Sequence, residues 1–453
     1  MKRPQNKLFI IAVVSIFFLS AVVQDCDARN LSAADFKVSP TESYKTVVIS
    51  GRNYVKEDLV VPHNIDLKFD NGGTFQVEQG VSLTINGSFE APMQQIFKGP
   101  GKVLIGPGKV SEIFPQWWGA RGDGQHDDTA AIQSAIDSIS SGVITLPPGV
   151  YINTGMTVKG DFTLRGSGRG ATSLKFTPKQ GACLTLPLDC RRFAIEDLSL
   201  DADGPNTAFG VDGTNEYVAF FSMKRFRVVG FKTGIYIAAG MSMTFDDAYI
   251  GCYGLGARNG TVGLKLGNTE QDKGCTTVTV KDIYFANAEI CFYNRAAPSA
   301  IIRPIFETCY IGLESRSRAV VISPFFSGIK ENGTPAYFKD NGALFLGTYD
   351  VHEEFKFNSD TERNRTSWIA DTFDMTTASM KIGPIQLERN GIPSSFFGKK
   401  WFAAESSPTE GQWALGDICW NVSPARSKPI GWVCVKAGTP GTWQGWYTTA
   451  KSD

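Results

Sequence analysis

The chain has 453 residues, and its 45 Lys and Arg balance 45 Asp and Glu. Without a basic excess there is no electrostatic attraction to a phosphate backbone, so we expect no nucleic-acid partner. The length exceeds one ordinary compact core and fits an elongated repeat domain with a small appendage. Glycine (47 residues) and aromatic side chains (12%) are frequent, which favours a β-rich chain with many turns.

Residues 1–28 have the pattern of an export signal. A positively charged start precedes an apolar run at residues 8–19, and small residues precede a cleavage site after Ala28. The apolar run is too short for a comfortable membrane span, and no later segment is apolar enough to span. We therefore expect a secreted protein, extracellular or periplasmic, with no membrane span after signal removal. An uncleaved N-terminal anchor is the alternative.

Residues 39–116 read as N-terminal β coils. Short alternating runs such as Thr46–Ser50, Ile65–Phe69 and Ser82–Phe89 are separated by Gly and Asn. Strand-like alternation between turn residues predicts short strands. We expect these strands to form the first coils of a larger stack.

Residues 117–151 hold the most distinctive pattern of the chain. Trp-Trp-Gly-Ala-Arg-Gly-Asp-Gly at 117–124 runs into a predicted helix at about 128–140, and Gly142–Tyr151 reads as a strand ending in a turn. This run resembles the opening signature of the pectate-lyase-like superfamily of right-handed parallel β-helices. The resemblance implies an all-β solenoid with a short capping helix. We interpret Asp123, Asp127 and Asp128 as turn and cap residues of this signature rather than as catalytic groups.

An apolar pattern repeats through the middle of the chain. Six segments align on their apolar positions, at 195–200, 223–228, 245–250, 280–285, 302–307 and 322–327. A second element that begins with glycine follows in several repeats, at 234–237, 263–266 and 312–314. Repeats of this length with strand periodicity predict a solenoid whose core forms by stacking. We therefore expect a parallel β-helix over residues 117–350.

The aligned repeats also predict which side chains face the core. Four positions are expected to point inward: Leu198, Phe226, Ile283 and Ile305. Six positions are expected to point outward: Ser199, Arg227, Tyr249, Tyr284, Phe306 and Phe326.

The repeat fades towards the C-terminus. Residues 351–400 are charged and mixed, and we interpret them as the end of the stack and a connection. Residues 401–453 are rich in tryptophan and turns, which predicts a small aromatic-rich β module. Trp432, Trp443 and Trp446 are candidates for a sugar-binding platform. Alternatively, some of these rings form the core of so small a domain.

Eight cysteines remain once residues 1–28 are removed. Export permits disulfides, and proximity in the sequence favours Cys183–Cys190 and Cys419–Cys434, although spacing does not determine the connectivity. The other cysteines are expected to be buried as small apolar residues. No Cys and His residues have the spacing of a zinc site, so we assign no metal ligands.

The resemblance also implies a class of partner. The superfamily contains polysaccharide lyases, glycoside hydrolases, epimerases and tailspike depolymerases, which act on acidic or complex glycans. We therefore expect an exported polysaccharide-degrading enzyme, a glycoside hydrolase or a polysaccharide lyase. The alternatives are a non-catalytic glycan-binding or cell-surface protein, and a prophage tailspike-like depolymerase that acts as a homotrimer. The export signal counts against the tailspike.

Carboxylates on the repeated strands are the candidate catalytic groups for hydrolysis. Glycoside hydrolysis needs one protonated and one ionised carboxyl group close together. Asp246 and Asp247 are adjacent, and Glu307 lies further along the chain. Stacked coils are expected to bring a column of charged side chains beside the aspartates, made up of Glu196, Lys224, Lys281 and Arg303. Alternatively, the repeated aspartates, Asp247 among them, hold turns at a corner of each coil.

A lyase needs a base and a cation that neutralises the uronate carboxylate. Lys281 and Arg303 are candidates for these roles, and Asp246 with Asp247 could hold Ca²⁺; no other cofactor is expected. The chain lacks the Arg-x-Pro-x-x-Arg pattern of pectate lyases, and it lacks the Asn-Thr-Asp and Gly-His-Gly motifs of polygalacturonases. These departures leave hydrolysis and β-elimination open.

Aromatic residues are the candidate substrate-binding groups. Tyr249, Tyr284 and Phe306 are predicted to form an outward ladder whose rings stack on sugar faces. A loop or a neighbouring subunit that covers these rings is the alternative.

Overall fold

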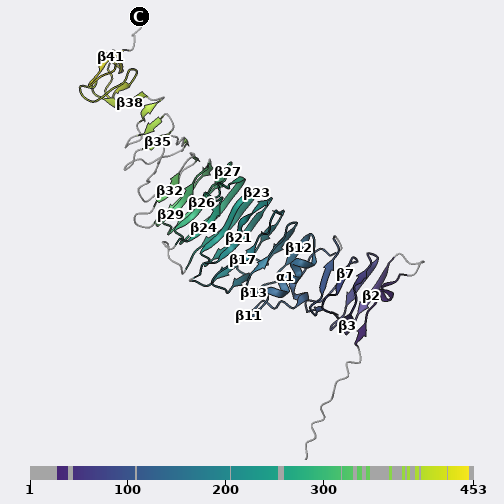
Figure 1. Cartoon of the computed structure of the whole chain (residues 1–453). Helices are drawn as coiled ribbons and strands as arrows, with labels where there is room; N and C mark the ends of the chain where they lie inside the picture. Colours follow the sequence, from purple (N-terminus) through teal and green to yellow (C-terminus); the bar gives the residue numbers. More distant parts are fainter. Residues whose placement is uncertain are drawn as a thin grey trace, which may run out of the picture.

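The structure is a computed structural model of the whole chain, and it is an elongated parallel β-helix (Figure 1). It describes residues 28–38, 44–107, 110–204, 206–253, 260–317, 319–329, 399–425 and 427–447, together with the strands at 334–338, 343–346, 367–369, 380–382, 385–387 and 393–396. The predicted export signal therefore lies almost wholly outside the described residues.

The N-terminal coils form three parallel sheets. The first sheet contains β1 (Arg29–Asn30), β3 (Arg52–Val55), β6 (Thr74–Val77) and β9 (Phe97–Lys98). The second contains β2 (Lys45–Ile49), β5 (Ile65–Phe69) and β8 (Phe89–Glu90), and the third contains β4 (Leu59–Val61), β7 (Ser82–Ile85) and β10 (Lys102–Ile105). A short 3-10 helix, η1 (Ala33–Phe36), follows β1.

The main stack begins at β11 and has three faces, each a ladder of parallel strands. Face 1 contains β12 (Gly142–Thr145), β15 (Phe162–Arg165), β19 (Ala194–Glu196), the start of β22 (Ser222–Val229), the middle of β23 (Thr233–Gly251) and of β25 (Cys275–Ala286), β27 (Ser299–Ile302), β30 (Ala319–Ile322), β33 (Ala343–Leu346) and β34 (Ser367–Ile369). Face 2 contains β11 (Asp123–Asp127), β13 (Gly149–Asn153), β16 (Thr172–Phe176), β20 (Ser199–Ala202), the ends of β22, β23 and β25, β28 (Ile305–Glu307) and β31 (Phe325–Ser327).

Face 3 completes each coil. It contains β14 (Met156–Thr157), β17 (Ala182–Thr185), the start of β21 (Phe209–Ala219) and of β23, β24 (Val262–Leu266), β26 (Ile290–Asn294), β29 (Ile311–Ser315) and β32 (Thr334–Phe338). The short β18 (Cys190–Arg191) pairs with the end of β21.

The signature segment joins the N-terminal coils to the main stack. Ile113 bridges to face 1, β11 pairs with β13 on face 2, and α1 (Thr129–Ser138) contacts both β10 and β14. The helix therefore stands where a face 3 strand would otherwise lie. Before it, η2 (Pro115–Trp118) packs Trp117 on Phe89 and Trp118 on Phe97, with ring centroids 4.8 and 4.9 Å apart.

The core consists of side-chain ladders that run along the inside of each face. On face 1, a fully buried apolar side chain from each coil stacks on the next, through Leu164, Ile195, Met223, Phe245 and Val280. This is the packing expected of a solenoid, in which each coil contributes one layer of the core. The predicted inward positions Leu198, Phe226 and Ile283 are buried, as expected.

The prediction that two aromatic residues face outward is wrong. Phe306 and Phe326 are buried, and their rings stack inside the core, 5.0 Å apart, with Phe306 also on Phe285 at 5.3 Å. The strand register explains the error, because Tyr284 pairs with Ile305 and Phe285 pairs with Phe306. One residue of slip moves a side chain to the opposite face of a strand, so Ile305 is outward and only part-buried rather than inward.

Ser199 is also buried rather than exposed. It occupies an outward row of face 2 beside Arg227, but its hydroxyl donates a hydrogen bond to the carbonyl of Arg169. The loop that carries Arg169 therefore covers it.

The C-terminal region is a sheet of seven strands. It consists of β35 (Met380–Ile382), β36 (Ile385–Leu387), β37 (Pro393–Phe396), β38 (Lys399–Ala404), β39 (Ile418–Asn421), β40 (Gly431–Lys436) and β41 (Thr442–Trp446). Most of residues 351–400, predicted to end the stack, lie outside the described residues.

The three predicted platform tryptophans do not share one face of this sheet. Trp432 pairs with Gly445 and Trp446 pairs with Gly431, so their side chains leave opposite faces of the β40–β41 pair. Trp443 packs on Trp413 at 5.4 Å, whereas Trp446 packs on Trp420 at 5.5 Å. A single three-ring platform is therefore wrong, and Trp443 and Trp446 belong to two separate ring clusters.

The predicted disulfides are wrong as well. Cys183, Cys190, Cys419 and Cys434 are free and buried, and burial raises the pKa of the Cys183 thiol to about 12. The disulfide that the structure describes joins Cys291 in β26 to Cys309 just before β29. It links neighbouring coils, a proximity that sequence spacing does not show. Within the described part of the chain, no helix is long and apolar enough to cross a membrane.

Candidate functional site

The predicted charged column exists on face 1. Strand register places Arg165, Glu196, Lys224, Asp246 and Lys281 in one outward row. Their charges alternate along the row, and Lys281 donates a hydrogen bond to Asp246 at 3.3 Å. That bond raises the pKa of the Lys281 ammonium, which therefore stays protonated. A permanently protonated lysine is a poor general base.

The corner between faces 1 and 2 carries the other predicted charges. Asp197, Arg225, Asp247, Asp282 and Arg303 occupy equivalent places and have left-handed backbones, with φ between 48° and 57°. Aspartate tolerates this conformation better than most residues. We call these five residues the charged corner.

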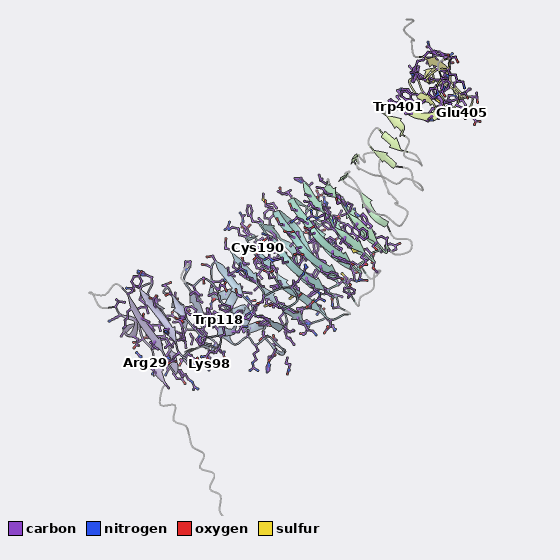
Figure 2. All side chains as sticks on the ribbon, turned by 180° about the vertical axis from the view of Figure 1, so that it is seen from behind. Arg29, Lys98, Trp118, Cys190, Trp401 and Glu405 are labelled. Atoms are coloured by element: carbon purple, nitrogen blue, oxygen red, sulfur yellow. A yellow bond between two sulfur atoms is a disulfide. The ribbon has the colours of Figure 1, made fainter. Side chains whose placement is uncertain are left out.

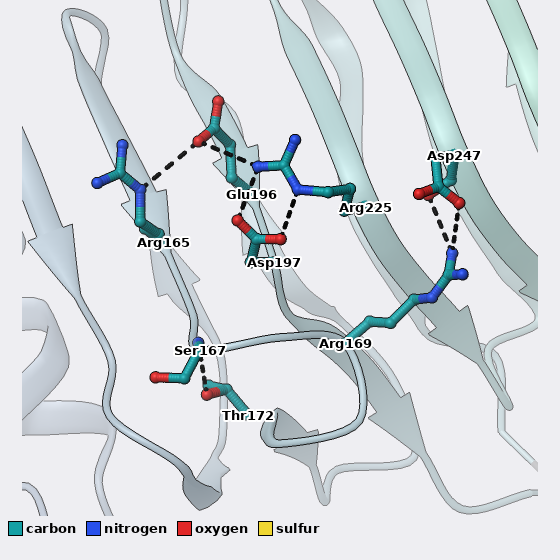
Figure 3. A network of polar contacts seen from close by, with 8 residues as sticks. All are labelled: Arg165, Ser167, Arg169, Thr172, Glu196, Asp197, Arg225 and Asp247. Atoms are coloured by element: carbon teal, nitrogen blue, oxygen red, sulfur yellow. Dashed lines mark hydrogen bonds and ion pairs between the residues drawn. The ribbon is translucent and has the colours of Figure 1, made fainter.

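Ion pairs link the charged corner from coil to coil. Arg225 binds Asp197 through two hydrogen bonds of 2.6 and 2.7 Å, and Glu196 lies between Arg165 and Arg225 (Figure 3). Asp247 accepts a bond of 2.8 Å from Arg169, whose loop reaches across from an earlier coil (Figure 3). These contacts support the interpretation of the aspartates as corner residues.

Arg303 belongs to this corner and not to the charged column. Ile302 takes the place in the column beside Lys281, and Arg303 forms a two-fold ion pair with Asp282 at 2.6 and 2.7 Å. The Arg303 guanidinium holds the pKa of the Asp282 carboxyl below its usual value. Placing Arg303 in the column is the same one-residue register error that reversed Phe306.

The tyrosine ladder on face 2 is real but shorter than predicted. Tyr249 and Tyr284 stack on each other with centroids 5.3 Å apart, and the Tyr284 hydroxyl donates to Glu307. This hydrogen bond raises the pKa of Tyr284 to about 12. Tyr253 also stacks on Tyr249, with centroids 6.0 Å apart, so Tyr249 is the middle ring and only Tyr253 and Tyr284 can offer a ring face to a sugar. Glu307 thus lies beside Tyr284 on face 2, while Asp246 lies on face 1 and Asp247 on the corner.

The calcium hypothesis receives no support from these positions. Asp246 and Asp247 face Lys281 and Arg169 respectively. Among the described residues, no group of three or more His, Cys, Asp and Glu side chains is arranged to hold a metal ion. Calcium prefers six or more oxygen ligands.

Face 3 holds a cleft of about 570 Å³ that the sequence did not predict. Its floor is one row of side chains from four adjacent strands, Tyr236, Lys265, Tyr293 and Glu314, which pair in register. The alternate residues of the same strands, such as Leu264 and Phe292, point into the core. We call this row and the adjacent Arg316 the tyrosine–lysine cleft.

Lys265 is the central group of this cleft. Its ammonium lies 4.3 Å from the ring centroid of Tyr236 and 5.8 Å from that of Tyr293. Burial lowers the pKa of Lys265, although the charges of Glu270 and Glu314 oppose the shift. Lys265 therefore loses its proton more readily than an exposed lysine.

An arginine and a glutamate lie at the edge of the cleft. Arg316 binds Glu314 at 2.7 Å, and its guanidinium also lies 5.6 Å from the Tyr293 ring centroid. Glu314 is almost fully buried, so this ion pair holds the Arg316 guanidinium at a defined place.

A tight loop between β24 and β25 forms one wall of the cleft. Asn268 and Lys273 bridge its ends, and the Thr269 hydroxyl is hydrogen-bonded to that of Tyr293. Arg295 of the next coil holds the loop through the Asn268 carbonyl at 2.7 Å. Glu270 of this loop also lines the cleft.

The sequence contains a signal for this cleft. Each glycine-led repeat at 234–237, 263–266 and 312–314 has an apolar residue and then a polar or aromatic one. The apolar residue is the core position, and the next residue is Tyr236, Lys265 or Glu314. Reading these third positions as one outward column would have brought the row together.

The cleft can perform acid–base chemistry on an anionic substrate. A lysine with a lowered pKa can accept a proton, tyrosine hydroxyls can donate one, and Arg316 can bind a carboxylate.

One protein-family model matches the segment that contains the signature. Residues 117–186 match the family model "Rhamnogalacturonase A/epimerase, pectate lyase-like". This match, together with the parallel ladders, confirms the superfamily resemblance predicted from the sequence.

Two kinds of curated relative match part of the chain. Mannuronan C5-epimerase AlgE5 of Azotobacter vinelandii is 34% identical over 113 residues, which are 21% of this chain and 11% of the epimerase. Alginate lyase 7 of the same organism is 33% identical over 113 residues, 21% of this chain and 13% of the lyase. The chain thus matches only about a tenth of the length of these relatives.

Solved structures resemble the chain over a larger share at low identity. The gp42 tailspike of Acinetobacter phage vb_AbaP_AS12 is 12% identical with a TM-score of 0.45, covering 76% of this chain and 83% of the tailspike. PfbA, a surface adhesin of Streptococcus pneumoniae, is 12% identical with a TM-score of 0.42, covering 75% of this chain and 99% of PfbA. Scores this low support no functional argument.

Proposed function

We propose that this pectate lyase-like β-helix protein is an exported enzyme that removes the C5 proton of a uronate unit in an acidic polysaccharide. The tyrosine–lysine cleft is its active site. The observation that carries the proposal is Lys265, a lysine with a lowered pKa held between Tyr236 and Tyr293. Beside it, Arg316 supplies a fixed cation for the uronate carboxylate.

Each residue of the cleft has a separate role in the proposed reaction. Neutral Lys265 accepts the C5 proton while Arg316 neutralises the adjacent carboxylate, which stabilises the carbanion that forms. Either tyrosine hydroxyl then donates a proton. Donation to C5 from the opposite face gives the epimer, and donation to the departing glycosidic oxygen completes β-elimination.

The names of the curated relatives support this reaction class. They include a C5-epimerase and a lyase that act on mannuronan and alginate, and both reactions begin with loss of the C5 proton.

Export remains part of the proposal. The Cys291–Cys309 disulfide is typical of proteins that leave the reducing cytosol, and it agrees with the predicted signal at residues 1–28. Homotrimer formation remains a prediction.

Deuterium exchange tests the function directly. The full mature chain is incubated in heavy water with mannuronan, alginate and polygalacturonate, and NMR measures deuterium at C5. We expect C5 exchange, with or without ultraviolet absorbance from an unsaturated uronate. New reducing ends without unsaturation or exchange would establish a hydrolase instead. Binding without any chemical change would establish a glycan-binding protein.

A further inference from the structure

We propose that a second pocket, between β10 and α1, binds another uronate unit of the same polysaccharide chain. The inference rests on the proposed function for its substrate class. The pocket holds about 370 Å³ and lies at the junction of the N-terminal coils and the main stack. Its size is in the range of small-ligand sites.

The pocket combines an aromatic ring with two lysines. Trp118 lines it, and the Phe97 ring packs against the Trp118 indole at 4.9 Å and holds it in place. Lys98 and Lys102 line the same pocket, and Figure 2 shows Lys98 and Trp118 in this part of the stack. An indole stacks on the apolar face of a sugar, and ammonium groups bind its carboxylate.

The lysines have no other electrostatic role in the part of the chain that the structure describes. Neither Lys98 nor Lys102 forms an ion pair there, in contrast to the cations of the charged corner. Asp137 of α1 also lines the pocket and can accept a hydrogen bond from a sugar hydroxyl. A sugar acid offers both groups, a carboxylate and hydroxyls.

The turn that borders the pocket contains two glycines, which leave space beside it. Lys98 and Lys102 are separated by Gly99, Pro100 and Gly101, and Gly99 has φ of 89°. A Cβ on Gly101 would meet the backbone carbonyl of Glu78 at 2.4 Å, so the turn packs tightly on the previous coil. The two lysines are therefore held at the two ends of a rigid turn.

The pocket and the tyrosine–lysine cleft lie along one flank of the molecule. On face 3 the order is β10, α1, β14, β17, β21, β23 and β24, because α1 contacts both β10 and β14. At the strand spacing of about 4.8 Å, the four steps from β14 to β24 span about 20 Å. The helix between β10 and β14, about 10 Å across, brings the separation of the two sites to roughly 30 Å. A polysaccharide can reach both sites at once, and a trisaccharide cannot.

Two linked sites on one polymer increase its apparent affinity, because the second contact becomes intramolecular. The pocket therefore selects long chains over short ones without taking part in the chemistry.

The test compares two pairs of lysines. Lys98→Ala/Lys102→Ala removes the pocket cations, and Lys56→Ala/Lys68→Ala removes two cations elsewhere on the N-terminal coils. Calorimetry measures the Kd of mannuronan and polygalacturonate, and kinetics gives kcat and KM for the polymer and for a mannuronate trisaccharide. We expect the pocket variant to raise the polymer Kd and KM about tenfold or more. Its kcat and its trisaccharide KM should equal those of the wild type and the control.

Equal polymer Kd values for the pocket variant and the control would overturn the inference and leave the proposed function intact. Measuring the polymer Kd in a Lys265→Met background tests the pocket independently of the proposed catalytic function. If the wild type shows no C5 exchange but the pocket lysines still account for polymer binding, the proposed function fails and the pocket stands. If the wild type binds neither polymer, the pocket assignment fails as well.

Discussion

The charged corner and the tyrosine–lysine cleft are built on the same coils, but their charged side chains lie in different environments. At the corner each cation meets a carboxylate of a neighbouring coil, as in the pairs Arg225–Asp197 and Arg303–Asp282. In the cleft, Lys265 lies among aromatic rings and is partly desolvated. Pairing keeps a group in its charged form, whereas desolvation makes its proton available. Burial and partner, rather than residue type, distinguish the two regions.

The two lysines Lys265 and Lys281 provide the strongest test of this comparison. We expect Lys265→Met to lower kcat by about 10²- to 10⁴-fold, the usual contribution of a general base. Lys281→Met should leave kcat unchanged, because Lys281 is held protonated by Asp246. Both rates are measured by C5 exchange, and circular dichroism checks folding. An equal loss of kcat in the two variants would contradict the proposed difference between Lys265 and Lys281.

The pH dependence of kcat/KM should reflect the pKa of Lys265 and not the charged groups of the corner. Only the neutral amine accepts a proton, so kcat/KM should fall about tenfold for each pH unit below the Lys265 pKa. That pKa lies below the ordinary 10.5 because of burial. Glu270 raises it, so Glu270→Gln should move the profile to lower pH, by about one unit or less. Asp272→Asn makes the same charge change on the same loop and should leave the profile in place.

Breaking the corner should cost little stability. Arg303→Ala removes the bidentate ion pair with Asp282 and leaves Lys281 as the partner of that carboxylate. Because the side chains of Arg303 and Asp282 are partly exposed, we expect only a small loss in the free energy of unfolding. The loss should shrink further at high salt. Urea unfolding at low and high salt measures both effects. A large, salt-independent loss would mean that the corner does more than hold turns.

The smallest effect is expected at the carboxylates proposed first from the sequence. Asp246→Asn and Glu307→Gln should leave kcat unchanged, because these groups lie outside the cleft, on faces 1 and 2. Steady-state kinetics on the substrate found by C5 exchange would show this. A strong loss of kcat in either variant would indicate that the active site lies at the charged column or at the tyrosine ladder.

Much of the fold was predictable from local pattern. The run at 117–124, the strand periodicity and the glycine-led repeats are all local features, and together they predicted a parallel β-helix with a short helix. Hydrogen bonds confirm the turn role of the signature aspartates. Asp123 accepts from the backbone of Gln125 and His126, and Asp128 accepts from that of Arg121.

The site was less predictable because it depends on register and on distant contacts. The step from Lys281 to its partner Ile302 is one residue shorter than the aligned pattern, which misplaced Arg303 and Phe306 together. The lowered pKa of Lys265 depends on burial by two rings from other coils. The Cys291–Cys309 pair likewise needs the coils to be stacked before the two sulfurs are near each other.

The junction at Trp117 and Trp118 has a consequence for how the molecule unfolds. In the described residues the N-terminal sheets end at β10 and the large sheet begins at β11, so no strand ladder runs through the junction. The two parts are joined by the ring packing of Trp117 and Trp118, by the contact of α1 with β10, and by a backbone bond from Ile96 to Trp117. Nearest-neighbour coupling along a solenoid is therefore weakest at this point, and the N-terminal coils can open as a separate cooperative unit. Amide hydrogen exchange should then show one common opening free energy for β2–β10 and a higher one for β15–β29.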